Sequence, residues 1–185
     1  MNIGLRNDEV VLVPYESTWE MEFQKIKEEL LHRTNLTSVQ IEHIGSTSIQ
    51  GMRAKPVIDL LVGVSDLACI EKSFFKQLAQ AGFHRLRVER PDEIVCAKFT
   101  DDTFQIKTHF IHLVQYEGQK WQELLFFRDY LRANEEMREQ YEQLKISFFE
   151  TGLKGIMAYT DYKEDFVRTI LAEMRVDNGN NRISN

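Results

Sequence analysis

The chain of 185 residues has only two cysteines and contains no CxxC pair. Cys69 and Cys96 each lie in an apolar segment, and their spacing matches neither a zinc site nor a disulfide framework. We therefore expect two reduced thiols in the core of a cytoplasmic protein.

Long apolar runs are missing as well. The N-terminus lacks a basic segment followed by an apolar one, and no run approaches the roughly 20 residues that a membrane helix needs. We expect a soluble protein that does not associate with a membrane.

Basic residues are outnumbered by acidic ones. The 23 lysines and arginines face 29 aspartates and glutamates, which makes the formal net charge −6 and the pI about 5.4. Binding to a nucleic-acid backbone irrespective of sequence requires a clustered basic face, and this charge balance argues against it. One local positive pocket for a small anion is compatible with it.

Apolar residues, at 43% of the chain, are abundant enough for one sizeable core. The length favours one folding unit, and we predict a single domain over residues 1–176. Residues 177–185 are polar and predict a disordered tail. The sequence does not determine the oligomeric state.

Helical and strand periodicities alternate along the chain, which predicts an α/β or α+β domain. Residues 17–30 begin with a capping-box pattern and continue as an apolar helical stripe. Residues 57–64 form a nearly continuous apolar run, typical of a strand inside a sheet. Further strands are expected at 9–13, 39–44, 93–99 and 104–115, and further helices at 66–82, 121–149 and about 160–174.

The stretch IEHIGSTSIQGMRAKPVIDLLV, residues 41–62, contains most of the residues with a chemical use. Gly45 permits a close backbone approach, and Ser46, Thr47 and Ser48 offer hydroxyls beside the free N–H groups of a helix start. Such a turn can bind phosphate. Serine and threonine also cap helices without any ligand, so the turn alone leaves both interpretations open.

Asp59 interrupts the apolar strand. Its burial is costly unless the carboxylate is hydrogen-bonded, protonated or paired with a cation, and a metal is one solution. Strand alternation places its side chain on one face with Val57, Leu61 and Gly63. The alternative is a structural aspartate that binds the 45–47 loop.

The chain resembles the GrpB family of the DNA-polymerase-β-like nucleotidyltransferase superfamily. The segment HIGSTSIQGMRAKPVIDLLVGV carries the resemblance, and VPYESTW, THFIHLV, FFRDYLRANEEMREQYEQLK and YTDYKEDFV extend it over nearly the whole chain. The resemblance implies a mixed β-sheet flanked by helices. Within that fold Gly45 and Ser46 would bind nucleotide phosphate, and Asp59 would be the first acid to bind Mg²⁺ or Mn²⁺.

Leu61 stands where the superfamily has its second acid. Two metal ions require several anionic ligands, and one aspartate is not enough. Glu93 is a possible further acid, although it lies at the start of a strand, and Asp101 and Asp102 read as turn residues.

The histidines offer another ligand. A His-x-His pair that the resemblance implies corresponds here to Phe110 and His112. His109 and His112 project to opposite faces of a regular strand, so without a bulge they cannot share a metal. We expect His112 to be a catalytic and metal-binding partner of Asp59, and His109 to be structural. His43 could bind the turn, a ligand or neither.

Positive charge for an anionic substrate is expected from Lys55 and, within the segments that carry the resemblance, from Arg128 and Lys163. Each could equally be a surface charge or an ion-pair partner. Further candidates are Arg53, Lys98 and Lys107.

Three functions are consistent with these residues. The first is metal-dependent nucleotidyl transfer to an acceptor that the sequence does not identify. The second is a non-catalytic module that binds a nucleotide or another phosphorylated small molecule, with a link to coenzyme-A metabolism implied by the resemblance, because GrpB-like domains occur fused to dephospho-coenzyme-A kinase. The third is a hydrolase or transferase with one Zn²⁺ or Mn²⁺ on Asp59 and His112. Leu61 favours the second.

Overall fold

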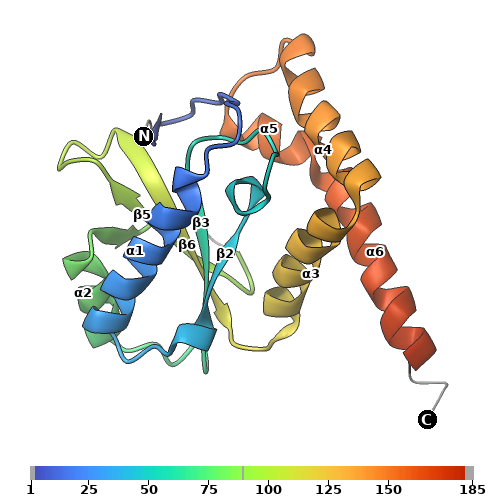
Figure 1. The fold of residues 1–185 in the computed structure, drawn as a ribbon. Helices are drawn as coiled ribbons and strands as arrows, with labels where there is room; N and C mark the ends of the chain where they lie inside the picture. Colours follow the sequence, from blue (N-terminus) through green and yellow to red (C-terminus); the bar gives the residue numbers. More distant parts are fainter. Residues whose placement is uncertain (1–2, 89, 182–185) are drawn as a thin grey trace.

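The computed structural model describes residues 3–88 and 90–181, with side chains up to Met174. A sheet with the strand order β2, β3, β6, β5, β4 forms its centre, and β1 pairs with β6 beside this path (Figure 1). The strands are β1 (Leu5–Arg6), β2 (Ile41–Ile44), β3 (Ile58–Val64), β4 (Phe83–Arg85), β5 (Ile94–Phe99) and β6 (Ile106–Gln115).

The sheet is mixed. β3 and β6 run parallel, whereas the pairs β2–β3, β5–β6 and β4–β5 are antiparallel. β3 and β6 lie inside the sheet, as their apolar sequences predict. The expected strand over 57–64 and the hairpin formed by β5 and β6 are confirmed.

Helices cover both faces of the sheet, which confirms the predicted fold class (Figure 1). On one face, Leu60 and Val62 of β3 pack in a core with residues of the first two helices. On the other face, Leu61 packs against Trp121. The helices are α1 (Thr18–Arg33), α2 (Lys72–Gln80), α3 (Gln119–Ala133), α4 (Glu135–Ser147), α5 (Ile156–Tyr162) and α6 (Glu164–Asn181), with 3₁₀ turns η1 (Ser38–Gln40), η2 (Ser46–Ser48) and η3 (Phe148–Glu150).

Helix α1 confirms the predicted apolar stripe, because Trp19, Phe23, Ile26 and Leu30 are all buried. The expected capping box does not form. Ser17 has a helical backbone conformation and its side chain makes no capping hydrogen bond.

Two element predictions in the first half are wrong. Residues 9–13 form no strand, and only Val13 makes an isolated bridge, with Ala54. Helix α2 begins at Lys72 instead of following Asp66, because the Asp66 carboxylate accepts the Ala68 N–H in a local turn instead of capping the helix.

The prediction of one long helix over 121–149 is wrong too, because the helix is interrupted at Asn134, between α3 and α4. This residue has φ −118° and ψ 103°, and its side chain accepts the Met137 N–H at 3.2 Å, so it caps α4. The last helix is likewise divided, into α5 and α6. Helix α6 extends to Asn181, so residues 177–181 of the expected tail are helical, and residues 182–185 lie outside the described residues.

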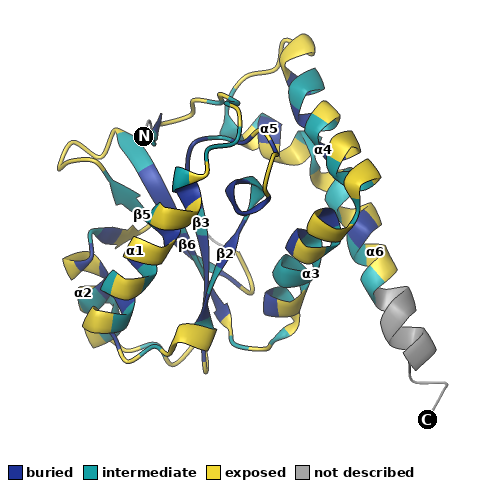
Figure 2. Cartoon of the chain, viewed as in Figure 1, coloured by how far each residue is buried: buried dark blue, intermediate teal, exposed yellow. Residues whose placement is uncertain are grey.

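Figure 2 shows that burial concentrates in the sheet, whereas the outer sides of α1 and α4 are exposed. Both cysteines are free; Cys96 is buried as expected, but Cys69 is exposed, so the prediction of two core thiols is wrong for Cys69. In the part of the chain that the structure describes, no helix combines the length and apolar character needed to cross a membrane.

Candidate functional site

The glycine turn after β2 lies directly against Asp59. Gly45 has φ 70° and ψ −178°, a backbone region that is essentially limited to glycine. A β carbon at Gly45 would collide with the Asp59 carboxylate. Ile44 pairs with Asp59 in the sheet, and this register brings the turn and the acid together, as the sequence predicts.

The three hydroxyls of the turn have different partners. Ser48 Oγ donates to the Gly45 carbonyl at 2.6 Å, and Thr47 Oγ1 lies 3.1 Å from His43 Nε2. Both side chains are buried and brace the turn. Ser46 is half-buried, and its Oγ accepts a hydrogen bond from Lys145 Nζ at 3.1 Å. Because Ser46 is an acceptor in this bond, its own O–H is free to donate to a ligand.

His43 contacts the turn through Thr47. Its ring stacks on Phe23 with a centroid separation of 4.7 Å, and its Nδ1 lies 3.2 Å from Glu20 Oε2. Burial lowers the pKa of His43, against the opposing effect of Glu20. A neutral ring can donate from Nδ1 to Glu20 and accept from Thr47 at Nε2. We therefore interpret His43 as a brace of the turn.

Asp59, His112 and Glu93 form a chain of polar contacts. Asp59 Oδ1 lies 3.4 Å from His112 Nε2, and Glu93 Oε1 contacts His112 Nδ1. The second Glu93 oxygen accepts from Arg90 at 2.7 Å. The Glu93 side chain is only 3% exposed, whereas His112 and Asp59 are 19% and 29% exposed. The imidazole is therefore held between two carboxylates.

This arrangement favours charge on all three groups. Burial opposes the imidazolium, but the hydrogen bonds and negative charges of Asp59 and Glu93 outweigh it and raise the pKa of His112 to about 9. For Glu93, burial is likewise outweighed by His112 and Arg90, and its pKa falls to about 2. The pKa of Asp59 is also lowered, because contacts with His112 and the charge of Lys55 overcome burial.

His109 projects to the opposite face, as predicted. Its Nε2 lies 3.4 Å from Glu22 Oε1 of α1, and its ring meets Phe83 edge-on at 6.2 Å. The sheet register does shift between Lys98 and Phe99, beside His109, but this irregularity does not bring His109 to the side of His112.

The donor set does not fit a site for two divalent metal ions. Leu61, at the position of a second acid, is fully buried, and Phe110, beside Asp59 in the neighbouring strand, offers no donor atom. Both ring nitrogens of His112 already face carboxylates. Among the residues that the structure describes, no three His, Cys, Asp or Glu side chains are placed to hold a metal. Two-metal chemistry needs more anionic ligands than this.

Two predicted lysines lie near Asp59. The ammonium groups of Lys55 and Lys163 sit 5.4 Å and 4.2 Å from the centroid of the Tyr159 ring. Burial lowers the pKa of both lysines, and for Lys163, where the Lys55 charge adds to burial, the pKa falls to about 7. Asp59 acts in the opposite direction on each. Two cations thus flank one tyrosine beside one acid.

Lys145 is a residue of the site that sequence reasoning missed. It is 1% exposed, and its ammonium donates to Ser46 Oγ and to the Arg53 carbonyl. Burial, together with the charge of Lys163, lowers its pKa to about 7. In the sequence, Lys145 belongs to the polar face of the predicted helix over 121–149, which is typical of a face in contact with solvent. The helical pattern therefore does not predict that Lys145 is buried. The one available signal is its place at the end of the FFRDYLRANEEMREQYEQLK segment.

The guanidinium group of Arg128 is engaged within the protein. It donates to Glu42 Oε2 at 2.7 Å, to the His43 carbonyl at 3.0 Å and to Asp129. Arg132, one helical turn later, donates to the Ser48 carbonyl at 2.8 Å. Both arginines therefore tie α3 to the strand and turn that carry the site.

The other basic residues that the sequence offers for an anionic substrate lie elsewhere. Lys98 pairs with Glu29 of α1 at 3.2 Å, and Lys107 contacts Asn7. Arg53 is exposed and contributes its backbone groups, its N–H to Glu142 and its carbonyl to Lys145.

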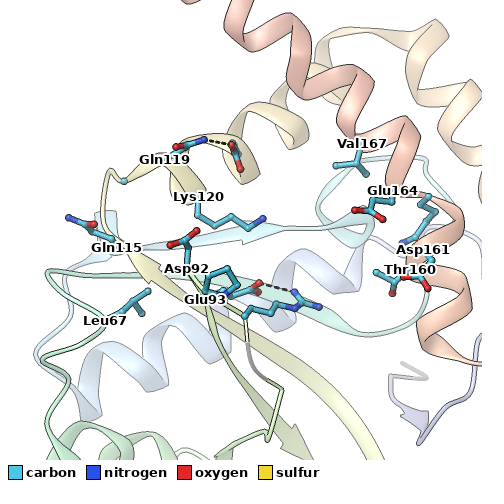
Figure 3. A pocket seen from close by; sticks show the side chains of 15 residues that line it. Leu67, Asp92, Glu93, Gln115, Gln119, Lys120, Thr160, Asp161, Glu164 and Val167 are labelled. Atoms are coloured by element: carbon cyan, nitrogen blue, oxygen red, sulfur yellow. Dashed lines mark hydrogen bonds and ion pairs between the residues drawn. The ribbon is translucent and has the colours of Figure 1, made fainter.

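A cleft of about 690 Å³ opens beside these residues (Figure 3). It lies between the segment that precedes β5, the start of α3, and the junction of α5 with α6. Lys163 and Glu93 belong both to the cleft and to the groups around Asp59. The cleft therefore continues the candidate site outward.

A family model described as GrpB protein matches residues 9–173. The chain belongs to the GrpB family. The glutamate-rich protein GrpB of Alkalihalophilus pseudofirmus is 40% identical over 173 residues, which cover 93% of this chain and 99% of that protein. The family resemblance seen in the sequence is thereby confirmed.

A conserved GrpB protein from Enterococcus faecalis has a similar crystal structure, with a TM-score of 0.74, 26% identity, and coverage of 88% of this chain and 96% of that one. The Cid1 poly(U) polymerase with bound MgGTP is more distant, at a TM-score of 0.46 and 12% identity over 71% of this chain and 43% of Cid1. A likeness this weak carries no argument about activity.

Some relatives are longer than this chain. The dephospho-CoA kinase of Mycolicibacterium paratuberculosis is 28% identical over 183 residues, which cover 86% of this chain and 44% of the kinase.

Proposed function

We propose that this GrpB protein binds the phosphate groups of a small molecule, a nucleotide or another phosphorylated compound, and that it does so without a divalent metal. The observation that carries the proposal is a group of three lysines around the turn and its acid. Lys145 donates to Ser46 of the turn, while Lys55 and Lys163 lie beside Tyr159 and are influenced by the charge of Asp59, which lies against Gly45. Phosphate requires hydrogen-bond donors and positive charge, and these residues supply both.

Ser46 supports this assignment. Lys145 donates to its oxygen, so the hydroxyl hydrogen is left to donate to an acceptor such as a phosphate oxygen. Thr47 and Ser48 bind within the protein and hold the backbone of the turn. The predicted phosphate-binding role thus stays with Gly45 and Ser46, while we assign Thr47, Ser48 and Arg128 to positioning.

The lysines are poised to respond to an anion. Lys145 and Lys163 have pKa values of about 7 because they are buried near other positive charges. A bound phosphate would raise both pKa values, so binding at neutral pH would be accompanied by proton uptake. The negative charge of Asp59 partly balances the positive charges of Lys55 and Lys163.

Nucleotidyl transfer, the leading expectation from the resemblance, is the second candidate. One observation favours it, namely that Asp59 lies against the turn, where an acid and a phosphate could both be reached. The donor set does not fit two Mg²⁺ or Mn²⁺ ions. Leu61, two residues after Asp59, and Phe110, which pairs with Asp59 in the sheet, offer no atom that could bind a metal. A single Zn²⁺ or Mn²⁺ on Asp59 and His112 would have to displace the contact between them.

The link to coenzyme-A metabolism belongs to the same proposal. A relative named dephospho-CoA kinase contains a region similar to this chain. Dephospho-coenzyme A is itself a phosphorylated small molecule, so it is one of the compounds to test.

The test is thermal melting of the purified protein with pyrophosphate, ATP or dephospho-coenzyme A, each in EDTA or in Mg²⁺. A ligand at 100 times its Kd adds about 2.7 kcal/mol to the free energy of unfolding. We expect a shift that persists in EDTA, persists in Asp59→Asn, and is lost in Lys163→Met. Lys25→Met, which removes the same charge at a position 73% exposed on α1, is the matched control and should keep the shift.

The other outcomes are equally informative. A shift that needs Mg²⁺ and is lost in Asp59→Asn contradicts metal-independent binding and supports the transferase. The absence of any shift would mean that the turn serves only to terminate β2 and cap a short helix.

A further inference from the structure

The cleft of about 690 Å³, whose lining is drawn in Figure 3, neighbours the groups around Asp59. Lys163 and Glu93 line it and also contact or face the groups around Asp59. Glu93 is connected through His112 to Asp59, which lies against Gly45, so a molecule whose phosphate is bound at the turn can extend towards this cleft. Its volume lies within the range of small-molecule sites.

Most of the residues that line the cleft have polar or charged side chains, and none of them is aromatic. Leu67, Pro91 and Val167 are its apolar members, and they come from three separate segments. Recognition of a nucleobase usually relies on stacking against an aromatic ring or on a continuous apolar surface. This cleft offers neither, so its chemistry points away from a base.

Several polar groups of the cleft are already engaged within the protein. Gln119 donates to Glu123 at 2.8 Å, and Arg90 donates to Glu93 at 2.7 Å; both pairs are drawn in Figure 3. Glu164 accepts from Arg168 of α6 at 2.6 Å. These side chains shape the wall.

Others are available to a ligand. Within the described residues, the side chains of Asp92, Gln115, Lys120 and Asp161 line the cleft and take part in no hydrogen bond or ion pair with other side chains or with the backbone. The two carboxylates can each accept hydrogen bonds from a pair of hydroxyls, and the amide and the ammonium can donate to hydroxyl or ring oxygens. These residues come from four segments: Asp92 precedes β5, Gln115 ends β6, Lys120 lies at the start of α3, and Asp161 lies near the end of α5.

We propose that the cleft binds a polyhydroxylated, sugar-like group, so that the ligand of the whole site is a sugar phosphate. This inference rests on the proposed function, because the phosphate is what anchors the molecule at the turn. It also narrows the range of ligands that the proposed function allows, because the affinity for the ligand would come from its phosphate and hydroxyl groups and not from a nucleobase.

Isothermal titration calorimetry in EDTA tests the proposal with two pairs of probes. We expect glucose 1-phosphate to bind at least tenfold more tightly than inorganic phosphate, and ATP to bind no more tightly than tripolyphosphate. Asp161→Asn and Lys120→Gln should reduce the advantage of glucose 1-phosphate to less than twofold and leave the affinity for inorganic phosphate unchanged. Asp165→Asn, on α6 and outside the cleft, is fully exposed and should change neither value.

The two proposals fail in different ways. If neither inorganic phosphate nor tripolyphosphate binds, the phosphate site itself is wrong. If both bind but glucose 1-phosphate gains nothing over inorganic phosphate, the phosphate site stands and the sugar-like ligand is rejected. ATP binding tenfold more tightly than tripolyphosphate would overturn the sugar proposal in favour of a nucleobase.

Discussion

The two faces of the central sheet bury histidines in opposite charge states. His109 and His112 lie three residues apart on β6 and therefore face different layers. On the side of α1 and α2, His109 is 2% exposed, and its ring packs against Phe83 with Glu22 Oε1 3.4 Å from Nε2. Burial, with the nearby charge of Lys98, lowers its pKa to about 3, so the ring is neutral.

His112 is 19% exposed and has carboxylate partners on both ring nitrogens. These partners overcome the effect of burial and raise its pKa to about 9. The comparison shows that burial alone does not set the charge of a histidine. The groups that the opposing elements supply decide it, and here they make one face of the sheet an apolar core and the other a charged site.

Among variants that alter the surroundings of these two histidines, we expect Glu93→Gln to have the largest effect on stability. The change removes a carboxylate that is 3% exposed and leaves a buried imidazolium with one acid instead of two. We expect a loss of about 3 kcal/mol in the free energy of unfolding at pH 6, measured by urea denaturation.

The matched control for that variant is Arg90→Gln, which removes the partner of Glu93 that is 47% exposed. It should cost no more than about 1 kcal/mol. Equal costs for the two variants would mean that the Glu93–His112 contact contributes little.

The pH dependence of stability sharpens the comparison further. The pKa of His112 is about 9 in the folded protein and about 6.5 when unfolded, so its stabilising contribution is complete below pH 6.5 and is lost as the pH rises through 9. Lys145 and Lys163 have the opposite effect. Their pKa is about 7 in the folded protein and about 10.5 in the unfolded chain, so their contribution to the free energy of unfolding increases as the pH rises from 7 to 10.5.

The difference between the wild type and His112→Asn isolates the histidine. Measured by urea unfolding at pH 6 and pH 10, this difference in the free energy of unfolding should shrink by on the order of 3 kcal/mol. A difference that is constant with pH would show that His112 is neutral in the folded protein.

The smallest effect at neutral pH is expected on the other face, in His109→Leu. The ring is neutral, its Nε2 makes no hydrogen bond, and its Nδ1 shares one hydrogen bond of 2.9 Å with Thr108 Oγ1, so an apolar side chain should cost no more than about 1 kcal/mol of the free energy of unfolding at pH 7. The folded pKa of about 3 lies below 6.5, so wild-type stability falls as the pH drops from 6.5 towards 3.

His109→Leu should lack that part of the acid sensitivity. Urea unfolding at pH 7 and pH 4 checks this, and the variant should gain stability relative to the wild type at pH 4. A variant that is strongly destabilised at pH 7 would instead show that the hydrogen bond between His109 and Thr108 contributes much more than about 1 kcal/mol to stability.

Local patterns predicted the parts of the fold that depend on local periodicity. The apolar run of β3 and the stripe of α1 follow from the side-chain periods of strands and helices, and both are observed. The same patterns could not reveal the break at Asn134, because apolar residues continue in helical phase across it. An asparagine in the middle of a helical pattern is compatible both with continuation and with a cap.

The candidate site was predictable only in part. Gly45, Ser46 and Asp59 lie close enough in sequence for one hairpin to bring them together. Glu93 sits at the start of a strand when read locally, and only the register of Val95 opposite His112 brings it to the imidazole. Lys145 lies 99 residues from Ser46 along the chain, so no local pattern links them.

By itself, the sequence determined the family, the main strands and the glycine turn with its acid, since these depend on residue order and on spacing within single elements. Only the tertiary structure decided which histidine carries charge, which lysines are buried and where the cleft opens. The physical reason is that desolvation and Coulomb interactions depend on distances in space, and packing sets those distances between elements that are far apart in the chain.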